Sequence, residues 1–275
     1  MPFIEVAGQH LEYLRLPARR TGRPPLVFLH EGLGSVAMWR DFPAQVAEAT
    51  GCGVLVWSRL GYGDSDPLPG RRTARYMHDE AWLGLPRLLR VLDIERPILV
   101  GHSDGGSIAL LHAAHDADSV AGVVALAPHE FVEEKALEGI RRAGQIYATT
   151  DWPQRLARFH RDPDTVFRAW HDIWLAPEFR TWDITDCLPR ITCPLLALQG
   201  CDDEYATMRQ IDCIAERAPD VELLALANCR HSPHRDQPQA VIAAITRFVD
   251  RLAAGAVIAD DGQRARARIE PARCD

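Results

Sequence analysis

The chain has 275 residues, of which 47% are hydrophobic and 25% charged, and its formal net charge is −7. This composition is typical of a globular protein with a large core, and the length suits one domain that carries an insertion. Basic and aromatic residues are not concentrated together, which argues against nucleic acid as a partner. The first residues do not resemble a signal peptide and no apolar run is long enough to cross a bilayer, so we expect no membrane partner.

The cysteines indicate the cellular compartment. There are seven of them, an odd number, and they are scattered without any C-x-x-C pair. Several lie in or beside apolar runs, as buried free cysteines do. We therefore expect a reduced, cytoplasmic protein.

The first third of the chain alternates between strand and helix patterns. Residues 4–16 alternate in polarity around Gly8, which predicts an opening hairpin. Residues 25–30 and 54–58 are short apolar runs typical of buried strands, whereas residues 77–92 carry apolar residues at helical spacing. Strands that alternate with helices predict an α/β fold with a parallel sheet and helices on both faces.

Residues 101–105 read G-H-S-D-G and match the pattern G-x-S-x-G. An apolar run ends just before them and a helical pattern over 106–114 begins just after them. Strand, tight turn and helix form the context of a nucleophile elbow, in which small neighbours allow a strained turn that exposes a serine. We identify Ser103 as the candidate nucleophile, and a plain glycine-rich turn is the alternative.

The strand and helix alternation is interrupted after the buried strand predicted over 120–126. Residues 130–188 contain no clean buried strand and read as helices cut by prolines. A helical segment above the elbow would close a pocket and exclude water. Four of the seven tryptophans lie in it: Trp152, Trp170, Trp174 and Trp182.

Candidate partners for the serine follow two later strands. A serine hydroxyl needs a base, which an acid orients. The apolar run 194–200 ends before Asp202 and Asp203, and the run 221–227 precedes His231 and His234. The order serine, acid, histidine is that of α/β-hydrolases. From position alone, either aspartate and either histidine could serve.

Four motifs carry a specific resemblance, and together with their surroundings they extend from about residue 5 to residue 252. They are L-H-E-G-L-G-S at 29–35, R-L-G-Y-G-D-S at 59–65, the elbow, and H-S-P-H-R-D-Q-P at 231–238. The chain resembles the α/β-hydrolase-fold serine hydrolases, and its S-D-G-G elbow is most similar to the biphenyl-hydrolase-like esterases. The resemblance implies a mostly parallel twisted sheet with helices on both faces. It further implies a core of residues 1–128 and 189–254, a helical cap over 129–188 and a flexible tail over 255–275.

The resemblance also implies a Ser103, Asp203 and His231 triad. The family's acid usually lies three residues after a strand-ending glycine, here Gly200, and its histidine opens an H-x-x-x-x-E-Q-P ending. Asp202 then caps a turn and His234 is structural. A metal site of His231, His234 and Asp203 would compete with this triad, so we expect no metal and no cofactor.

The oxyanion-hole donors implied by the resemblance are the backbone N–H groups of Gly32 and Asp104. Two departures from the family occur nearby. Arg230 replaces the glycine that usually precedes the catalytic histidine, and Glu31 replaces the glycine of an H-G-x-x-G loop. Glu31 either points away and braces the loop or enters the pocket. The Asp104 side chain either pairs with a substrate cation or stiffens the elbow.

The expected substrate pocket is the least specific part of this interpretation. Glu31, His129, Trp152 and Trp174 are the candidates for its lining. The alternative for His129 is a local bond in the core, and for the tryptophans it is packing of the cap. Caps diverge, so the sequence does not identify the acyl or alcohol group.

The resemblance implies hydrolysis of a small carboxylic ester, thioester or amide through an acyl-enzyme intermediate. One alternative is a C–C bond hydrolase acting on a meta-cleavage diketone, or a related haloperoxidase or lyase. A non-catalytic ligand-binding protein is a further alternative, which a complete triad disfavours. The expected partner is a small-molecule substrate, and a homodimer is compatible with this interpretation.

Overall fold

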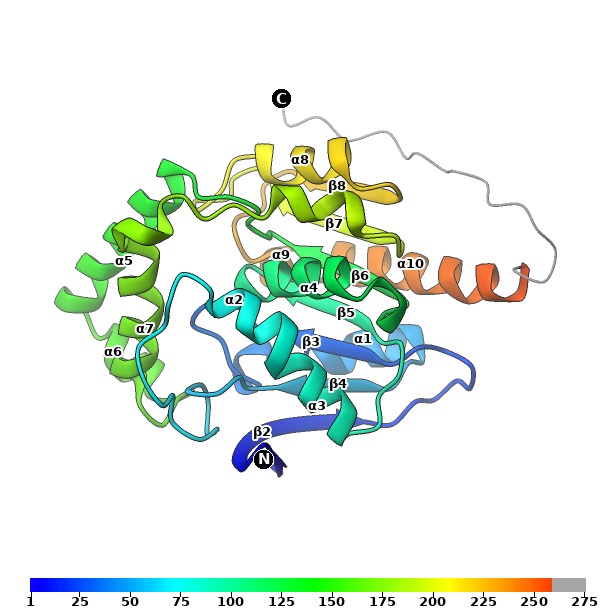
Figure 1. Cartoon of the computed structure of the whole chain (residues 1–275), viewed down its shortest axis with the longest axis horizontal. Coiled ribbons are helices and arrows are strands. Elements are labelled where there is room, and N and C mark those ends of the chain that lie inside the picture. The colour runs from blue at the N-terminus through cyan, green and yellow to red at the C-terminus, as the bar shows by residue number, and fades with distance from the viewer. Residues whose placement is uncertain (259–275) are drawn as a thin grey trace.

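The computed structural model describes residues 1–258 of the chain. Eight strands form one sheet in the order β1-β2-β4-β3-β5-β6-β7-β8 (Figure 1). The β1–β2 and β2–β4 pairs are antiparallel and the five other pairs are parallel, so the expected mostly parallel sheet is confirmed. The strands are β1 (Phe3–Val6), β2 (Gln9–Leu16), β3 (Leu26–Leu29), β4 (Val54–Trp57), β5 (Ile98–His102), β6 (Gly122–Leu126), β7 (Leu195–Gly200) and β8 (Val221–Leu226).

Helices cover both faces of this sheet, as expected. In Figure 1, α4 and the α2–α3 segment lie in front of the sheet, and α1 and α10 lie behind it, where they pack on each other. The α-helices are α1 (Phe42–Thr50), α2 (Tyr76–Asp79), α3 (Leu85–Val91), α4 (Asp104–His115), α5 (Glu134–Thr149), α6 (Trp152–Leu156), α7 (Pro163–Leu175), α8 (Arg209–Arg217), α9 (Pro233–Asp236) and α10 (Pro238–Ile258). The short helices are η1 (Ala37–Trp39), η2 (Glu80–Gly84), η3 (Ala117–Ser119), η4 (Pro177–Phe179) and η5 (Thr185–Arg190).

The central strands are apolar throughout because each face of the sheet has its own core. In β3, Leu26 and Phe28 pack into the cluster under α1 and α10, whereas Val27 and Leu29 pack into the cluster under α2 to α4. Successive side chains of a strand point to opposite faces, so a strand between two helical layers needs a continuous apolar run. This is why the parallel strands were readable from the sequence.

The helix expected over 77–92 contains a change of helical type. It begins as α2, widens into the π-helical turn η2 and continues as α3. Pro86 lies near the start of α3, where it lacks an N–H and its ring clashes with the carbonyl of the residue four positions earlier. A π-turn relieves such a conflict locally, and the segment stays helical.

The insertion expected over 129–188 contains α5, α6 and α7. An isolated bridge between Phe131 and Asp183 joins its two ends beside the sheet. Within the insertion, the rings of Tyr147 and Phe167 stack with centroids 3.7 Å apart, which fixes α5 against α7. The three helices lie together beyond one end of the sheet, at the left of Figure 1.

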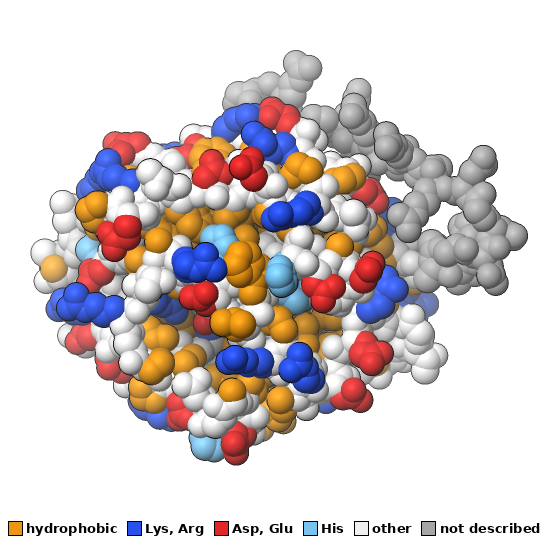
Figure 2. Space-filling model, in the orientation of Figure 1, with side chains coloured by type: hydrophobic (Ala, Val, Ile, Leu, Met, Phe, Trp, Pro, Cys, Tyr) orange, Lys and Arg blue, Asp and Glu red, His pale blue; other side chains and the backbone are white. Residues whose placement is uncertain are grey.

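The last helix, α10, continues to Ile258. The first four residues of the expected flexible tail are therefore helical, and its remainder, 259–275, lies outside the described residues. Within residues 1–258, no helix is long and apolar enough to cross a membrane. Acidic and basic side chains are interspersed on the face shown in Figure 2.

Candidate active site

Ser103 lies at the turn between β5 and α4, the expected strand–turn–helix context. Its φ of 51° and ψ of −119° are uncommon for a residue with a side chain and cost of order 1–3 kcal/mol. A Cβ at Gly101 would overlap the carbonyl of Gly105, and a Cβ at Gly105 would overlap the carbonyl of Leu29. The glycines of the motif are thus required by close backbone packing around the serine.

The structure brings Ser103, His231 and Asp203 together from three separate segments. The His231 Nε2 atom lies 3.0 Å from the Ser103 hydroxyl oxygen, and its Nδ1 atom lies 2.9 Å from each carboxylate oxygen of Asp203. An ionised carboxylate can only accept, so Nδ1 carries the hydrogen and Nε2 is free to accept from the serine. This arrangement can remove a proton from the serine hydroxyl.

The charges of His231 and Asp203 reinforce each other. Burial acts to lower the pKa of His231, but the Asp203 charge and hydrogen bond, with Glu204 and Glu31, raise it above its ordinary value. Burial acts to raise the pKa of Asp203, but His231 and the Tyr205 N–H that donates to it lower it overall. Asp203 therefore stays an anion and holds the imidazole in one orientation.

Hydrogen bonds to its backbone fix the loop that carries His231. The N–H of His231 donates to Glu204 at 3.0 Å, and its carbonyl accepts from His102 Nε2 at 2.7 Å. The N–H of Arg230 donates to the Asp236 carboxylate at 2.9 Å. Arg230, the residue that departs from the family pattern, is thus accommodated by a carboxylate from α9.

The competing candidates for acid and base lie elsewhere. Asp202 is exposed. His234 is buried against Trp39, Phe42 and His102, with ring centroids 4.7, 5.5 and 4.8 Å away. Burial, together with Arg235, lowers the pKa of His234 to about 3, so it stays neutral in the core.

The loop after β3 is held through its carbonyl groups. Arg59 donates to the carbonyls of His30 at 2.5 Å and Glu31 at 3.1 Å, and the Tyr62 hydroxyl donates to the carbonyl of Gly32 at 2.9 Å. The C=O and N–H of a trans peptide point in opposite directions. Because the Glu31 carbonyl faces Arg59, the Gly32 N–H of the same peptide points away from Arg59.

Trp170 of α7 covers Gly32. A Cβ at position 32 would overlap the indole ring of Trp170, so only glycine fits beneath it. Ser103 itself is only 6% exposed. Trp170 of α7 therefore lies beside one edge of the site, next to the loop that carries Gly32.

Asp104 is fully buried, and its side chain is turned away from the serine by a hydrogen bond. Its Oδ2 atom accepts from the Tyr76 hydroxyl at 2.7 Å, and that hydroxyl accepts from the Trp174 indole at 3.0 Å. Its Oδ1 atom has no hydrogen-bond partner in the described part of the chain. The contact with Tyr76 fits the alternative in which Asp104 stiffens the elbow. Its N–H lies in the first turn of α4, where N–H groups have no partner within the helix.

The Glu31 side chain folds over its own loop. A Cβ at Gly34 would overlap its carboxylate, and its Oε1 atom lies 3.9 Å from the Arg235 guanidinium. Burial raises the pKa of Glu31, with Arg235 acting in the opposite direction. These contacts fit the alternative in which Glu31 braces the loop.

Of the remaining pocket candidates, His129 lies near His231, Trp174 lies against His129, and Trp152 lies elsewhere. The His129 ring centroid is 5.6 Å from that of His231 and 5.0 Å from that of Trp174. Burial, with the His231 charge, lowers the pKa of His129 to about 4. Trp152 has ring contacts with Tyr147 and Phe167 inside the insertion, and among residues 1–258 none joins it to His231.

Sequence reasoning missed several residues that shape this site. Tyr76 opens an amphipathic helix and Glu204 lies in a turn, so neither belongs to a motif. Trp170 was visible as one of four tryptophans, but nothing in the sequence distinguished it from the others. Tyr205, with its ring centroid 4.9 Å from that of His231, follows the acidic turn and gave no separate signal.

The chain resembles known proteins in sequence and in structure. The chain is 24% identical to a proline iminopeptidase of Lactobacillus helveticus over 243 residues, covering 74% of this chain and 81% of the relative. It is 26% identical over 257 residues to a 2-succinyl-6-hydroxy-2,4-cyclohexadiene-1-carboxylate synthase of Serratia proteamaculans, covering 82% and 93%. Its fold resembles that of a carboxylesterase of Nitrososphaera gargenis, with a TM-score of 0.73 at 22% identity, covering 92% of this chain and all of the other.

The sequence profile of the alpha/beta hydrolase family matches residues 26–244, which is most of the chain. The matched region begins at β3 and ends within α10, so it includes the elbow turn and the loops that carry Asp203 and His231. The narrower likeness to biphenyl-hydrolase-like esterases stays a prediction. The profile match, the strand order and the elbow all agree, and the chain belongs to the alpha/beta hydrolase family.

Proposed function

We propose that this protein is a serine hydrolase that cleaves a small carboxylic ester, thioester or amide through an acyl-enzyme intermediate. The observation that carries the proposal is the continuous hydrogen-bonded chain from Ser103 through His231 to Asp203. A serine hydroxyl is a weak nucleophile alone, and this arrangement supplies the base and the group that orients it. The coverage of the alpha/beta hydrolase profile supports the same reading.

In the proposed reaction, the Ser103 oxygen attacks the substrate carbonyl carbon while its proton passes to His231 Nε2. The tetrahedral intermediate collapses, and the alcohol, thiol or amine leaves with the proton that His231 returns. Water then attacks the acyl-enzyme, again with His231 as the base, and releases the acid. Asp203 remains ionised throughout and stabilises the imidazolium.

The negative oxygen of each tetrahedral intermediate needs fixed donors. We assign this role to the N–H groups of Gly32 and Asp104, one from the loop after β3 and one from the start of α4. Each such donor contributes roughly 3 kcal/mol to the transition state. The hydrogen bonds from Arg59 and Tyr62 to the neighbouring carbonyls support the assignment, because they hold the loop rigid before substrate arrives.

The proposed nucleophile is tested by labelling with a fluorophosphonate probe and by hydrolysis of an activated aryl ester. Wild type should label at one serine and release a burst of product, and Ser103→Ala should lose both. The loss in turnover should be on the order of 10⁶-fold, because removal of a triad nucleophile leaves only binding and the oxyanion hole. Ser107→Ala, one helical turn further along α4, is the matched control and should still label. A Ser103→Ala variant that keeps a tenth of the activity would overturn the proposal.

The bond that the protein cleaves is tested separately. An ester, thioester and amide series is compared with a ring-cleavage dienol of the kind that C–C hydrolases accept. We expect the protein to prefer the acyl series. If the dienol is the better substrate, the proposed reaction becomes C–C bond cleavage, and Ser103 remains the proposed nucleophile.

A further inference from the structure

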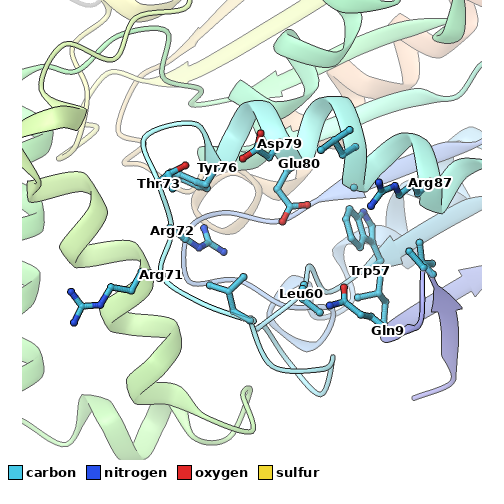
Figure 3. Close-up of a pocket in the computed structure, with 16 residues that line it drawn as sticks. Gln9, Trp57, Leu60, Arg71, Arg72, Thr73, Tyr76, Asp79, Glu80 and Arg87 are labelled. Atoms are coloured by element: carbon cyan, nitrogen blue, oxygen red, sulfur yellow. The ribbon is translucent and has the colours of Figure 1, made fainter.

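A second cavity lies away from Ser103, beneath the β1–β2 hairpin and beside α2 and η2. Its volume is about 290 Å³, and neither Ser103 nor His231 lines it. Trp57, Leu60 and Leu68 form part of its apolar wall, and Arg72 and Glu80 extend into it from a loop and from a helix (Figure 3). We call it the hairpin cavity.

Arg72 makes no direct ion pair with any described residue, although the charges of Glu80 and Asp104 act to raise its pKa. Its guanidinium lies over the rings of Tyr62 and Tyr76, 4.8 and 4.7 Å from their centroids. Its Nε and Nη1 atoms are buried and have no hydrogen-bond partner among residues 1–258. Arg72 is half-buried, and a guanidinium that is partly removed from water without a hydrogen-bonded anion favours a ligand that supplies one.

Glu80 presents the opposite charge to the same space. Its carboxylate has no hydrogen bond or ion pair with any described residue, and Figure 3 shows it directed into the cavity from the helix side. Burial raises the pKa of Glu80, and the Arg59 and Arg72 charges act against that rise. The indole N–H of Trp57 is a further buried donor without a partner. The lining of the cavity therefore carries both signs of charge, from the basic residues Arg71, Arg72 and Arg87 and from the acidic residues Asp79 and Glu80.

We propose that the hairpin cavity binds a small zwitterionic α-amino acid with an apolar side chain. The ligand carboxylate would pair with Arg72, its ammonium with Glu80, and its side chain would contact Trp57 and Leu60. An anion alone would be repelled by Glu80 and a cation alone by Arg72, whereas a zwitterion complements both. A volume of about 290 Å³ suits a ligand of this size.

Two tyrosines connect the hairpin cavity to the candidate active site. This step of the inference rests on the proposed hydrolase function. Tyr62, under the Arg72 guanidinium, holds the Gly32 carbonyl at 2.9 Å, and Tyr76, also under it, holds the Asp104 carboxylate at 2.7 Å. Gly32 and Asp104 are the two proposed oxyanion donors. A ligand that draws Arg72 toward the cavity therefore acts on the contacts of both, and its occupancy should change kcat.

Binding is tested with L-phenylalanine by calorimetry on the Ser103→Ala protein, which lacks the proposed nucleophile. N-acetyl-L-phenylalanine, which lacks the ammonium, and L-phenylalanine amide, which lacks the carboxylate, are the single-charge probes. We expect saturable binding of phenylalanine and at least tenfold weaker binding of both derivatives. No saturable binding, or equal affinity for the three compounds, overturns the proposal. Because fluorophosphonate labelling is a separate measurement, failure of the hydrolase assignment is distinguishable from failure of this one.

The variants Glu80→Gln and Arg72→Met test whether phenylalanine binds in the hairpin cavity. Each should weaken phenylalanine binding at least tenfold, whereas Arg90→Met on the exposed side of α3 should leave it unchanged. Glu80→Gln keeps the shape of the side chain, so it remains informative if Arg72→Met does not fold. Undiminished binding to Glu80→Gln overturns the location.

The connection is tested by the hydrolysis of an aryl ester at saturating phenylalanine. We expect at least a twofold change in kcat in wild type and Arg90→Met, and none in Glu80→Gln. A change in KM alone, with kcat constant, would mean that phenylalanine competes at the serine and would overturn the connection.

Discussion

At the residue scale, the position of the proposed acid can be tested by comparing two neighbouring aspartates. Asp203 is 1% exposed and its carboxylate accepts a hydrogen bond from His231 Nδ1. Asp202 is exposed, and its backbone N–H donates to the carbonyl of Cys229. We expect Asp203→Asn to reduce kcat by about 10⁴-fold, because an amide favours the wrong imidazole tautomer. Asp202→Asn should change it less than threefold. Steady-state hydrolysis of one ester by both variants measures this, and the reverse order would move the acid by one residue.

The pH dependence of hydrolysis follows from the charges around His231. The proposed base must be neutral, and Asp203, Glu204 and Glu31 raise its pKa above the ordinary 6.5. We therefore expect kcat/KM to be low at acid pH and to rise with pH to a plateau, with a midpoint above 6.5. Glu204→Gln should lower the midpoint, since it removes one negative charge and retains an acceptor for the His231 N–H. A profile that stays flat from pH 5 to 8 in both proteins would be inconsistent with His231 as the base.

At the scale of elements, the elbow depends on the close approach of α4 to β3. A Cβ at Gly105 would overlap the Leu29 carbonyl and lie 2.7 Å from the His30 carbonyl, and backbone cannot move aside as a flexible side chain can. We expect Gly105→Ala to lower the free energy of unfolding by roughly 3 kcal/mol or more. Gly70→Ala, where a Cβ meets nothing within 4 Å, is the control and should be near neutral. Urea unfolding of both variants measures the difference, and similar stabilities would refute this account of the motif.

The role of α7 also belongs to this scale. Trp170 covers Gly32, and Trp174 on the next turn donates to Tyr76, so one helix contacts the surroundings of both proposed oxyanion donors. The packing of α7 therefore bears on the alignment of both proposed donors.

At the scale of the whole molecule, a buried acid beside the insertion makes stability depend on pH. Glu130 is 0% exposed, and neither of its carboxylate oxygens has a hydrogen-bond partner among the described residues. Burial raises the pKa of Glu130 well above its ordinary 4.5, with Glu133 and Asp183 adding to the rise. The folded chain therefore holds a proton on Glu130 that the unfolded chain releases, so the contribution of this residue to stability is fully present below pH 4.5 and is lost as the pH rises toward its folded pKa.

Glu130→Met removes this dependence, because its side chain is apolar and similar in volume. The free energy of unfolding of the variant minus that of wild type should increase from pH 5 to pH 8. We expect this increase to be on the order of 1 kcal/mol or more. Glu138→Met on the exposed side of α5 is the control and should show no such gain. Urea unfolding of both proteins at pH 5 and pH 8 measures this. If the stability difference between variant and wild type is the same at both pH values, Glu130 is not a buried neutral acid.

The fold and the elements around the elbow were predictable from the sequence because the signals are local. Apolar runs such as 98–102 mark buried strands, and the small residues at 101 and 105 mark a turn that only glycine permits. The order of a serine, an acid and a histidine after successive strands then predicted three side chains at one edge of the sheet. Each of these inferences depends on a residue and its near neighbours in the chain, which a sequence displays directly.

Tertiary structure alone decided the rest, because it depends on contacts between segments distant in the chain. Trp170 lies over Gly32 although 138 positions separate them. Tyr76 holds the Asp104 side chain, which the sequence left open between a substrate contact and a structural one. Trp152 packs within the insertion and not beside His231. The sequence determined which groups could react. The direction of each side chain depends on how the insertion packs on the sheet, and this packing decides the shape of the space above Ser103.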